Sequence, residues 1–173
     1  MTFPQERPRR LLRSETLRAM VRETTLTPAN LVLPLFVAPG VGVRRAVKSM
    51  PGVFQLSVDQ VIKEARAAVD ASVQSFMLFG LPERKDAEGT SAWDPEGPVP
   101  RAVAEIKQAL PNTVVMTDVC MCEYTTHGHC GQLGVDRRGK TVVDNDPTLE
   151  LLAREALCHA EAGADIVAPS DMM

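Results

Sequence analysis

Apolar residues gather in four short runs along the chain, at residues 31–37, 75–80, 113–118 and 164–169. Each run is apolar through its centre and is bounded by Gly, Pro, Ser or Asp. This length and composition are typical of strands that are buried on both faces, as in a parallel sheet. The pattern therefore predicts four buried strands.

Helical periodicity fills the stretches between these runs. The segment "SVDQVIKEARAAVDAS" places apolar residues on one face, and Ser57 with Gln60 predicts a capping box at its start. A second helix is expected from about Val99 to Leu110, with Pro111 ending it. A third is expected to start at residues 146–147 and to end at Gly163, and its apolar stripe includes Leu152, Ala156, Leu157 and Ala160.

Strands that alternate with helices predict βα units and a parallel sheet, either doubly wound or closed into a (β/α)8 barrel. The sequence G-x-G-x-x-G does not follow the first strand, which lowers the prospect of a dinucleotide-binding sheet. The long polar loops all follow strands, as in barrels whose chemistry lies at the carboxyl ends of the strands. We therefore expect an α/β fold of the (β/α)8, or TIM barrel, type.

The number of strands bears on the domain organisation. A complete barrel needs eight strands and about 250 residues, whereas four strands are found in 173 residues. We therefore expect residues 29–173 to form the first half of a barrel domain that is truncated here. Residues 1–28 mix arginines with a few apolar residues, and they are expected to form either a solvated tail or an arm that embraces a neighbouring subunit.

Charge and cysteine content limit which binding partners and which cellular compartment are expected. The net charge is −3, which does not favour nucleic acid or an anionic membrane as a partner. No apolar run reaches the ~18 residues of a membrane span. Three of the four cysteines are clustered and the first residues do not resemble a secretory signal, so we expect a reducing compartment, by default the cytoplasm.

The segment "TDVCMCEYTTHGHCGQL" carries the chemistry. If the chain stays extended after the third strand, Asp118, Cys120 and Cys122 point to the same side, and the glycines that follow can return Cys130 to that point. Three thiolates repel one another unless a cation holds them, and zinc accepts sulfur ligands readily. The pattern predicts a zinc site.

The number of ligands is ambiguous from the sequence. We favour the three cysteines with an open fourth position, as in catalytic zinc sites, although His127 or His129 could close the shell. A zinc knuckle that only staples the loop, or three unliganded thiols, are the simpler alternatives. Cys158 falls beside an apolar helical stripe and is expected to be a core residue.

Two residues that end strands are further candidates for the site. A carboxylate at the end of a barrel strand is costly unless it faces the site, so Asp118 is expected to be functional. Ser170 ends the fourth strand, where it could line the site or cap a following helix.

Several long segments resemble one family closely, porphobilinogen synthase or 5-aminolevulinic acid dehydratase. They include "FGLPERKDAEGTSAWDPEGPVPRAV", "TDVCMCEYTTHGHCGQL" and "APSDMM", and the resemblance runs from about residue 9 to the last residue. It implies a (β/α)8 barrel with an amino-terminal arm, usually assembled into a homo-octamer. The implied reaction joins two molecules of 5-aminolevulinate, with loss of two waters, to give porphobilinogen in haem and tetrapyrrole synthesis.

The resemblance also implies roles for individual residues. Cys120, Cys122 and Cys130 match the zinc-binding type of the family, in which the ion binds and polarises one substrate molecule. Asp118 matches an aspartate near the reacting amine and Ser170 a serine that lines the site. His129 matches a position that in some members holds a second, non-catalytic zinc, and an allosteric Mg²⁺ site would involve residues outside this chain.

One departure from the family limits what these residues can do. The family uses two lysines that form Schiff bases with the substrates, and these belong to later barrel strands. None of the five lysines present matches those motifs: Lys48, Lys63, Lys85, Lys107 and Lys140. We therefore expect residues 1–173 alone to be inactive. The alternative from another functional class is a structural zinc-binding module without catalysis.

Overall fold

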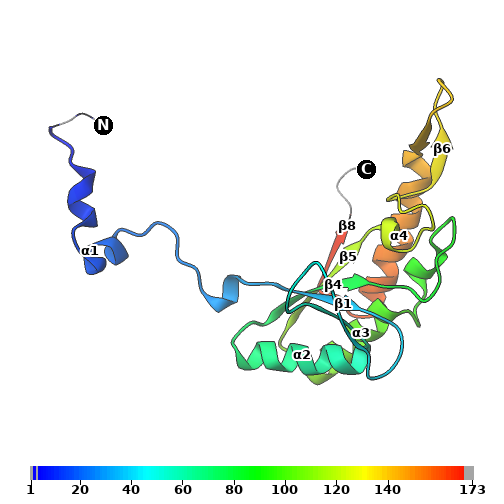
Figure 1. Cartoon of the computed structure of the whole chain (residues 1–173), viewed down its shortest axis with the longest axis horizontal. Coiled ribbons are helices and arrows are strands. Elements are labelled where there is room, and N and C mark those ends of the chain that lie inside the picture. Colours follow the sequence, from blue (N-terminus) through cyan, green and yellow to red (C-terminus); the bar gives the residue numbers. More distant parts are fainter. Residues whose placement is uncertain (1, 3, 170–173) are drawn as a thin grey trace.

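The computed structural model describes residue 2 and residues 4–169. Its centre is a twisted sheet in the order β2-β3-β1-β4-β5-β8 (Figure 1). Four parallel strands match the four predicted runs: β1 (Leu33–Val37), β4 (Ser75–Gly80), β5 (Val114–Val119) and β8 (Ile166–Pro169). The helices between them are α2 (Val58–Asp70), α3 (Pro98–Ala109) and α4 (Asn145–Glu161). The predicted alternation of strands and helices is confirmed.

One face of the sheet packs against the helices and forms the main core. Alternate strand residues such as Leu35, Phe76 and Val115 are fully or almost fully buried there. Val61 of α2 and Ile106 of α3 meet them in one apolar cluster. Burying such side chains contributes roughly 1.5–3 kcal/mol each, which is why the period-2 pattern of the strands fixes the face they present.

The opposite face of the sheet carries the residues that would point into a barrel. Phe36, Met77 and Met116 are half-buried, and Phe36 stacks on Phe79 with ring centroids 5.4 Å apart. Asp118 occupies the same face of β5, because it lies two residues after Met116. The alternation of β5 therefore separates a helix-packed side from an inner side that includes a carboxylate.

Two short hairpins were not predicted. β2 (Arg44–Ala46) pairs antiparallel with β3 (Phe54–Leu56), which in turn lies parallel to β1. β6 (Leu133–Val135) and β7 (Thr141–Val143) form a separate two-stranded ribbon that projects beside α4 in Figure 1. All four strands have three residues, too few to produce a clear alternating pattern in the sequence.

The start of α2 differs from the predicted capping box. Ser57 is the N-cap, but its hydroxyl accepts the N–H of Val43 at 2.8 Å and donates to Asp59 at 2.6 Å. The amide of Gln60 donates to Asp59 at 2.6 Å, not to the backbone of the cap. Val43, which lies just before β2, and Asp59 have taken the groups that a capping box would use, so this prediction was wrong.

The apolar stripe predicted for α4 was only half right. Leu152 is buried and Ala156 packs, partly buried, against the same core, as expected, but Leu157 is 59% exposed and Ala160 is exposed. The helix face that meets the sheet instead carries Thr148, Leu152, Glu155, Cys158 and His159. The prediction failed at these positions because α4 buries a glutamate and a histidine, two residue types that usually lie on the exposed face of a helix.

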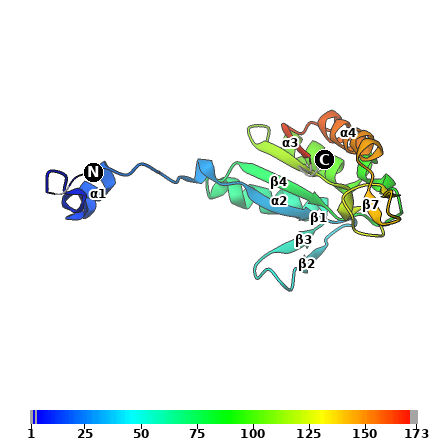
Figure 2. The ribbon, with the colours of Figure 1, turned by 90° about the horizontal axis from the view of Figure 1, so that it is seen from above.

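Residues 4–30 extend away from the sheet as an arm (Figure 2). They contain η1 (Pro8–Leu12), α1 (Glu15–Met20) and η2 (Pro28–Asn30), none of which buries a residue. Apolar side chains such as Met20 and Leu26 are more than 70% exposed. In the described part of the chain, no helix combines the length and the apolar character needed to cross a membrane.

Candidate metal centre

The cysteine loop begins where β5 ends. Cys120 is the N-cap of a single 3-10 turn, η4 (Met121–Glu123), so the chain does not stay extended as the sequence argument assumed. Met121 and Tyr124 are buried in a small core with Val119 and Leu152. These anchors fix the backbone on both sides of Cys122.

The three clustered cysteines meet at one point. The Sγ atoms of Cys120, Cys122 and Cys130 all lie within 4.8 Å of one another, and those of Cys120 and Cys122 are 3.4 Å apart. All three are free thiols. The predicted convergence is therefore present in the structure, although a helical turn and not strand alternation brings Cys122 beside Cys120.

Cys130 reaches this point through a tight return of the chain. Gly128 has φ 72°, a left-handed conformation that glycine adopts without a steric cost. The Thr125 hydroxyl donates to the His129 carbonyl at 3.0 Å and closes the turn. A Cβ on Gly131 would overlap the side chain of Thr148, so the glycine after Cys130 also allows the loop to pass close to α4.

The sulfur trio fits a divalent metal ion. A tetrahedral zinc ion bound ~2.3 Å from each sulfur separates the sulfurs by about 3.8 Å, close to the spacing found here. Burial raises the pKa of the Cys120 and Cys122 thiols, so without a cation both hold their protons. A bound cation reverses this preference, because it stabilises the thiolates directly. The trio can therefore bind a metal ion, and three sulfurs leave a fourth position for another ligand.

The two loop histidines lie outside this trio. Nδ1 of His127 accepts the His129 N–H at 3.1 Å, and its Nε2 lies 3.1 Å from the Ala87 carbonyl. Both ring nitrogens of His127 are thus engaged, which argues against it as a fourth ligand. The His129 side chain is exposed, and its ring centroid is 5.6 Å from that of His127.

Three carboxyl groups surround the base of the loop. Burial raises the pKa of Asp118. Burial, and then the charge of Asp118, raise the pKa of Glu123 to about 7. Glu155 of α4 is fully buried, and burial followed by the charges of Glu123 and Asp118 raises its pKa to about 9. Glu155 and Glu123 were not identified from the sequence, because neither lies in a recognisable ligand spacing.

Ser170, the other predicted site residue, lies outside the described residues. The five lysines are all described, and none lies on a strand of the sheet. Lys107 of α3 is engaged structurally: its ammonium group donates to both carboxylate oxygens of Asp165 at 2.9 and 3.0 Å.

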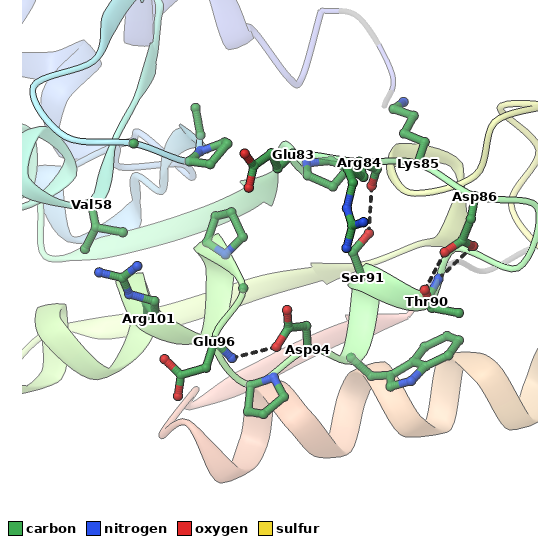
Figure 3. A pocket seen from close by; sticks show the side chains of 18 residues that line it. Val58, Glu83, Arg84, Lys85, Asp86, Thr90, Ser91, Asp94, Glu96 and Arg101 are labelled. Carbon is green, nitrogen blue, oxygen red and sulfur yellow. Dashed lines mark hydrogen bonds between the residues drawn. The ribbon is translucent and has the colours of Figure 1, made fainter.

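A large cavity lies elsewhere. It has a volume of about 780 Å³ and sits between the end of β1, the loop before α3 and the first turn of α3 (Figure 3). Arg84, Lys85 and Arg101 line it together with Glu83 and Glu96. Neither Asp118 nor a cysteine lines this cavity, so it is separate from the metal centre.

The tight contact between β4 and the cysteine loop yields a testable prediction. A Cβ on Gly80 would overlap the hydroxyl of Tyr124. The Tyr124 residue is 3% exposed and so has little room to move. Gly80→Ala is therefore expected to reduce the free energy of unfolding by about 2 kcal/mol, as overpacking usually does. Removing the hydroxyl with Tyr124→Phe should recover part of this loss in the double variant. Urea denaturation of the four proteins measures it, and an undiminished loss in the double variant would contradict the contact.

Comparison with known proteins identifies relatives of this arrangement. The family model described as delta-aminolevulinic acid dehydratase matches residues 5–173. A protein of that name from Synechococcus elongatus is 54% identical over 172 residues, which are 99% of this chain and 52% of the relative. Another from Ruminiclostridium josui is 48% identical over 97% of this chain and 80% of the relative.

A solved structure agrees with these matches. The delta-aminolevulinic acid dehydratase of Toxoplasma gondii, in complex with its reaction product porphobilinogen, superposes with a TM-score of 0.87 at 36% identity. The alignment covers 98% of this chain and 47% of that chain, and it confirms the predicted TIM-barrel class for the part of the barrel present. This chain spans about half the length of the first curated relatives it matches. The chain belongs to the delta-aminolevulinic acid dehydratase family.

Proposed function

We propose that this chain supplies the zinc-binding half of a porphobilinogen synthase. The observation that carries the proposal is the meeting of three cysteine sulfurs at the carboxyl end of β5, beside Asp118 on the inner face of the sheet. This is the end of a barrel at which enzymes of this fold place their chemistry. The reaction would join two molecules of 5-aminolevulinate and release two waters.

In this proposal Cys120, Cys122 and Cys130 hold the zinc ion. The ion would supply Lewis-acid chemistry toward one substrate molecule through its fourth position. Asp118 would orient or deprotonate the reacting amine, and the raised pKa of its half-buried carboxyl keeps a proton exchangeable closer to neutrality. Ser170 would line the substrate site, and His129, which is exposed, would belong to a second zinc site outside the reacting centre.

The rest of the active site is expected from the other half of the barrel. The Schiff-base lysines, the arginines that bind substrate carboxylates and any allosteric Mg²⁺ site would lie there. Residues 1–28 would act as the arm of a homo-oligomer, most simply the octamer of the family, because described apolar side chains of this segment such as Met20 and Leu26 are more than 70% exposed. Residues 29–173 would form the first half of the catalytic domain, working in the cytoplasm.

A chimera tests this function directly. Residues 1–173 would be joined to the second half of the Synechococcus elongatus relative, which is 54% identical over the first half. We expect the chimera to convert 5-aminolevulinate to porphobilinogen, and Cys130→Ala to abolish this activity. Residues 1–173 alone should show none. Turnover by residues 1–173 alone, or an active Cys130→Ala chimera that contains no zinc, would overturn the proposal.

A structural metal site is the second candidate. It is favoured by the packing of Met121 and Tyr124 into the core, since a closed zinc knuckle would staple the same loop. The two candidates differ in the fourth ligand. Cobalt(II) substituted for zinc would show three sulfurs and an exchangeable ligand in the catalytic case, and a saturated protein shell in the structural case.

A further inference from the structure

Glu123 stands between two anchored residues of the cysteine loop. It follows Cys122 directly and precedes the buried Tyr124. Its carboxylate is turned toward β4, where Oε2 accepts the backbone N–H of Gly80 at 2.9 Å. This contact joins residues 43 positions apart in the chain.

The position of Gly80 explains why an acceptor is needed there. Gly80 is buried at the end of β4, and a buried N–H without a partner is costly. The ladder between β4 and β5 ends at the pair Leu78–Thr117, so β5 supplies no acceptor for Gly80. The Glu123 side chain supplies the acceptor for Gly80 that the β4–β5 ladder does not.

The other contacts that hold the loop act further along it. The Asp86 N–H donates to the Tyr124 carbonyl at 3.3 Å, and the Thr126 N–H donates to the Asp86 carbonyl at 2.9 Å. Both fix the chain after the 3-10 turn. Neither of these two bonds involves a neighbour of Cys122. The bond that Glu123 accepts from Gly80 does, because Glu123 follows Cys122 directly.

We propose that Glu123 is a positioning residue for the metal centre. By accepting the Gly80 N–H, it fixes η4 against β4 and so holds Cys122 at the place where its sulfur lies 3.4 Å from that of Cys120. Residues that orient metal ligands typically change metal affinity by 10- to 100-fold when they are replaced. The inference rests on the proposed metal-binding role of the cysteines.

Charge offers a different explanation, and it has a different consequence. A carboxylate beside three thiolates changes the local potential whether or not it accepts a hydrogen bond. Glutamine separates the two explanations, because its amide oxygen accepts an N–H but carries no charge. Methionine keeps most of the length and volume of glutamate but is a poor acceptor, and alanine removes both.

The experiment is a cobalt(II) titration of the full 173-residue chain followed by its absorption spectrum. Glu123→Met and Glu123→Ala are expected to weaken cobalt binding about tenfold and to alter the sulfur-to-cobalt and d–d bands. Glu123→Gln should retain the affinity within about twofold and keep the bands. Glu105→Ala removes an exposed carboxylate of α3 and should behave as the unchanged protein. Circular dichroism and urea unfolding without metal check that each variant is folded.

The outcomes are distinct. Equal weakening in the Gln, Met and Ala variants would overturn the positioning role in favour of charge, and unchanged binding in all three would overturn it outright. If the alanine variant does not fold, the methionine and glutamine variants decide the question, since they preserve the side-chain volume. Failure of the unchanged, folded chain to bind cobalt would instead contradict the proposed metal site itself.

Discussion

Replacing Cys122 by alanine is expected to lower the affinity of the protein for zinc by about a hundredfold to a thousandfold. Structural zinc sites with four ligands bind with apparent free energies of roughly 10–16 kcal/mol, or about 2.5–4 kcal/mol for each ligand. The loss should be similar at Cys120 and Cys130, because the three sulfurs form one group. Competition with a chelator of known affinity, at fixed pH, measures the effect.

Cys158 provides the matched control for this prediction. It is a buried free thiol on α4 and is not part of the trio. Cys158→Ala should cost about 1 kcal/mol of stability through lost packing, while the affinity for zinc stays within about twofold. If the two substitutions lowered zinc affinity equally, the trio would not be the metal site. Unaltered affinity in Cys122→Ala would lead to the same conclusion.

Replacing Glu155 by glutamine is expected to change how stability depends on pH. The pKa of Glu155 is about 9 in the folded protein, against 4.5 as the ordinary value. Below pH 4.5 both states are protonated and the difference has no effect on stability. Between pH 4.5 and 9 the unfolded chain loses the proton that the folded chain keeps, so folding is destabilised by up to about 1.4 kcal/mol per pH unit. Glutamine cannot ionise, so Glu155→Gln should be the more stable protein at pH 8.

His159 is the control, because it acts in the opposite direction. Burial lowers the pKa of His159 to about 4 from 6.5, and its neutral ring is fully buried. Its effect is therefore a loss of stability as the pH falls from 6.5 toward 4. Urea unfolding of metal-free protein from pH 5 to 9 should show Glu155→Gln flattening the alkaline side and His159→Gln the acid side. Parallel curves for Glu155→Gln and the unchanged protein would refute the buried-acid interpretation.

The main strands and the meeting of the cysteines could be predicted from the sequence. Buried parallel strands have continuous apolar runs, and these runs gave the places of β1, β4, β5 and β8. Cys120, Cys122 and Cys130 could be grouped because glycines flank the return of the loop. Zinc was chosen because the donors are sulfurs, and Asp118 was a candidate because it ends a strand. The specific roles of Asp118, Ser170 and His129 depended on resemblance to a family. All of these assignments remain proposals.

The remaining features depend on contacts between distant segments. Glu155 reads as a solvent-facing residue in a helical pattern, yet α4 turns it toward Asp118 and Glu123. The hydroxyl of Ser57 accepts the N–H of Val43, which lies just before β2, and does not form a capping box. When polar residues lie on both sides of a helix, local periodicity does not show which face of the helix will pack against the sheet.

Because side chains alternate along β5, its two faces have different roles in this part of the barrel. Val115, Thr117 and Val119 hold the strand to the helices, while Met116 and Asp118 face the interior of the barrel. Changes in the reacting groups can therefore accumulate on one side of the strand without loosening the packing that aims the cysteines. A single strand thus gives the fold room to alter its chemistry while its scaffold stays constant.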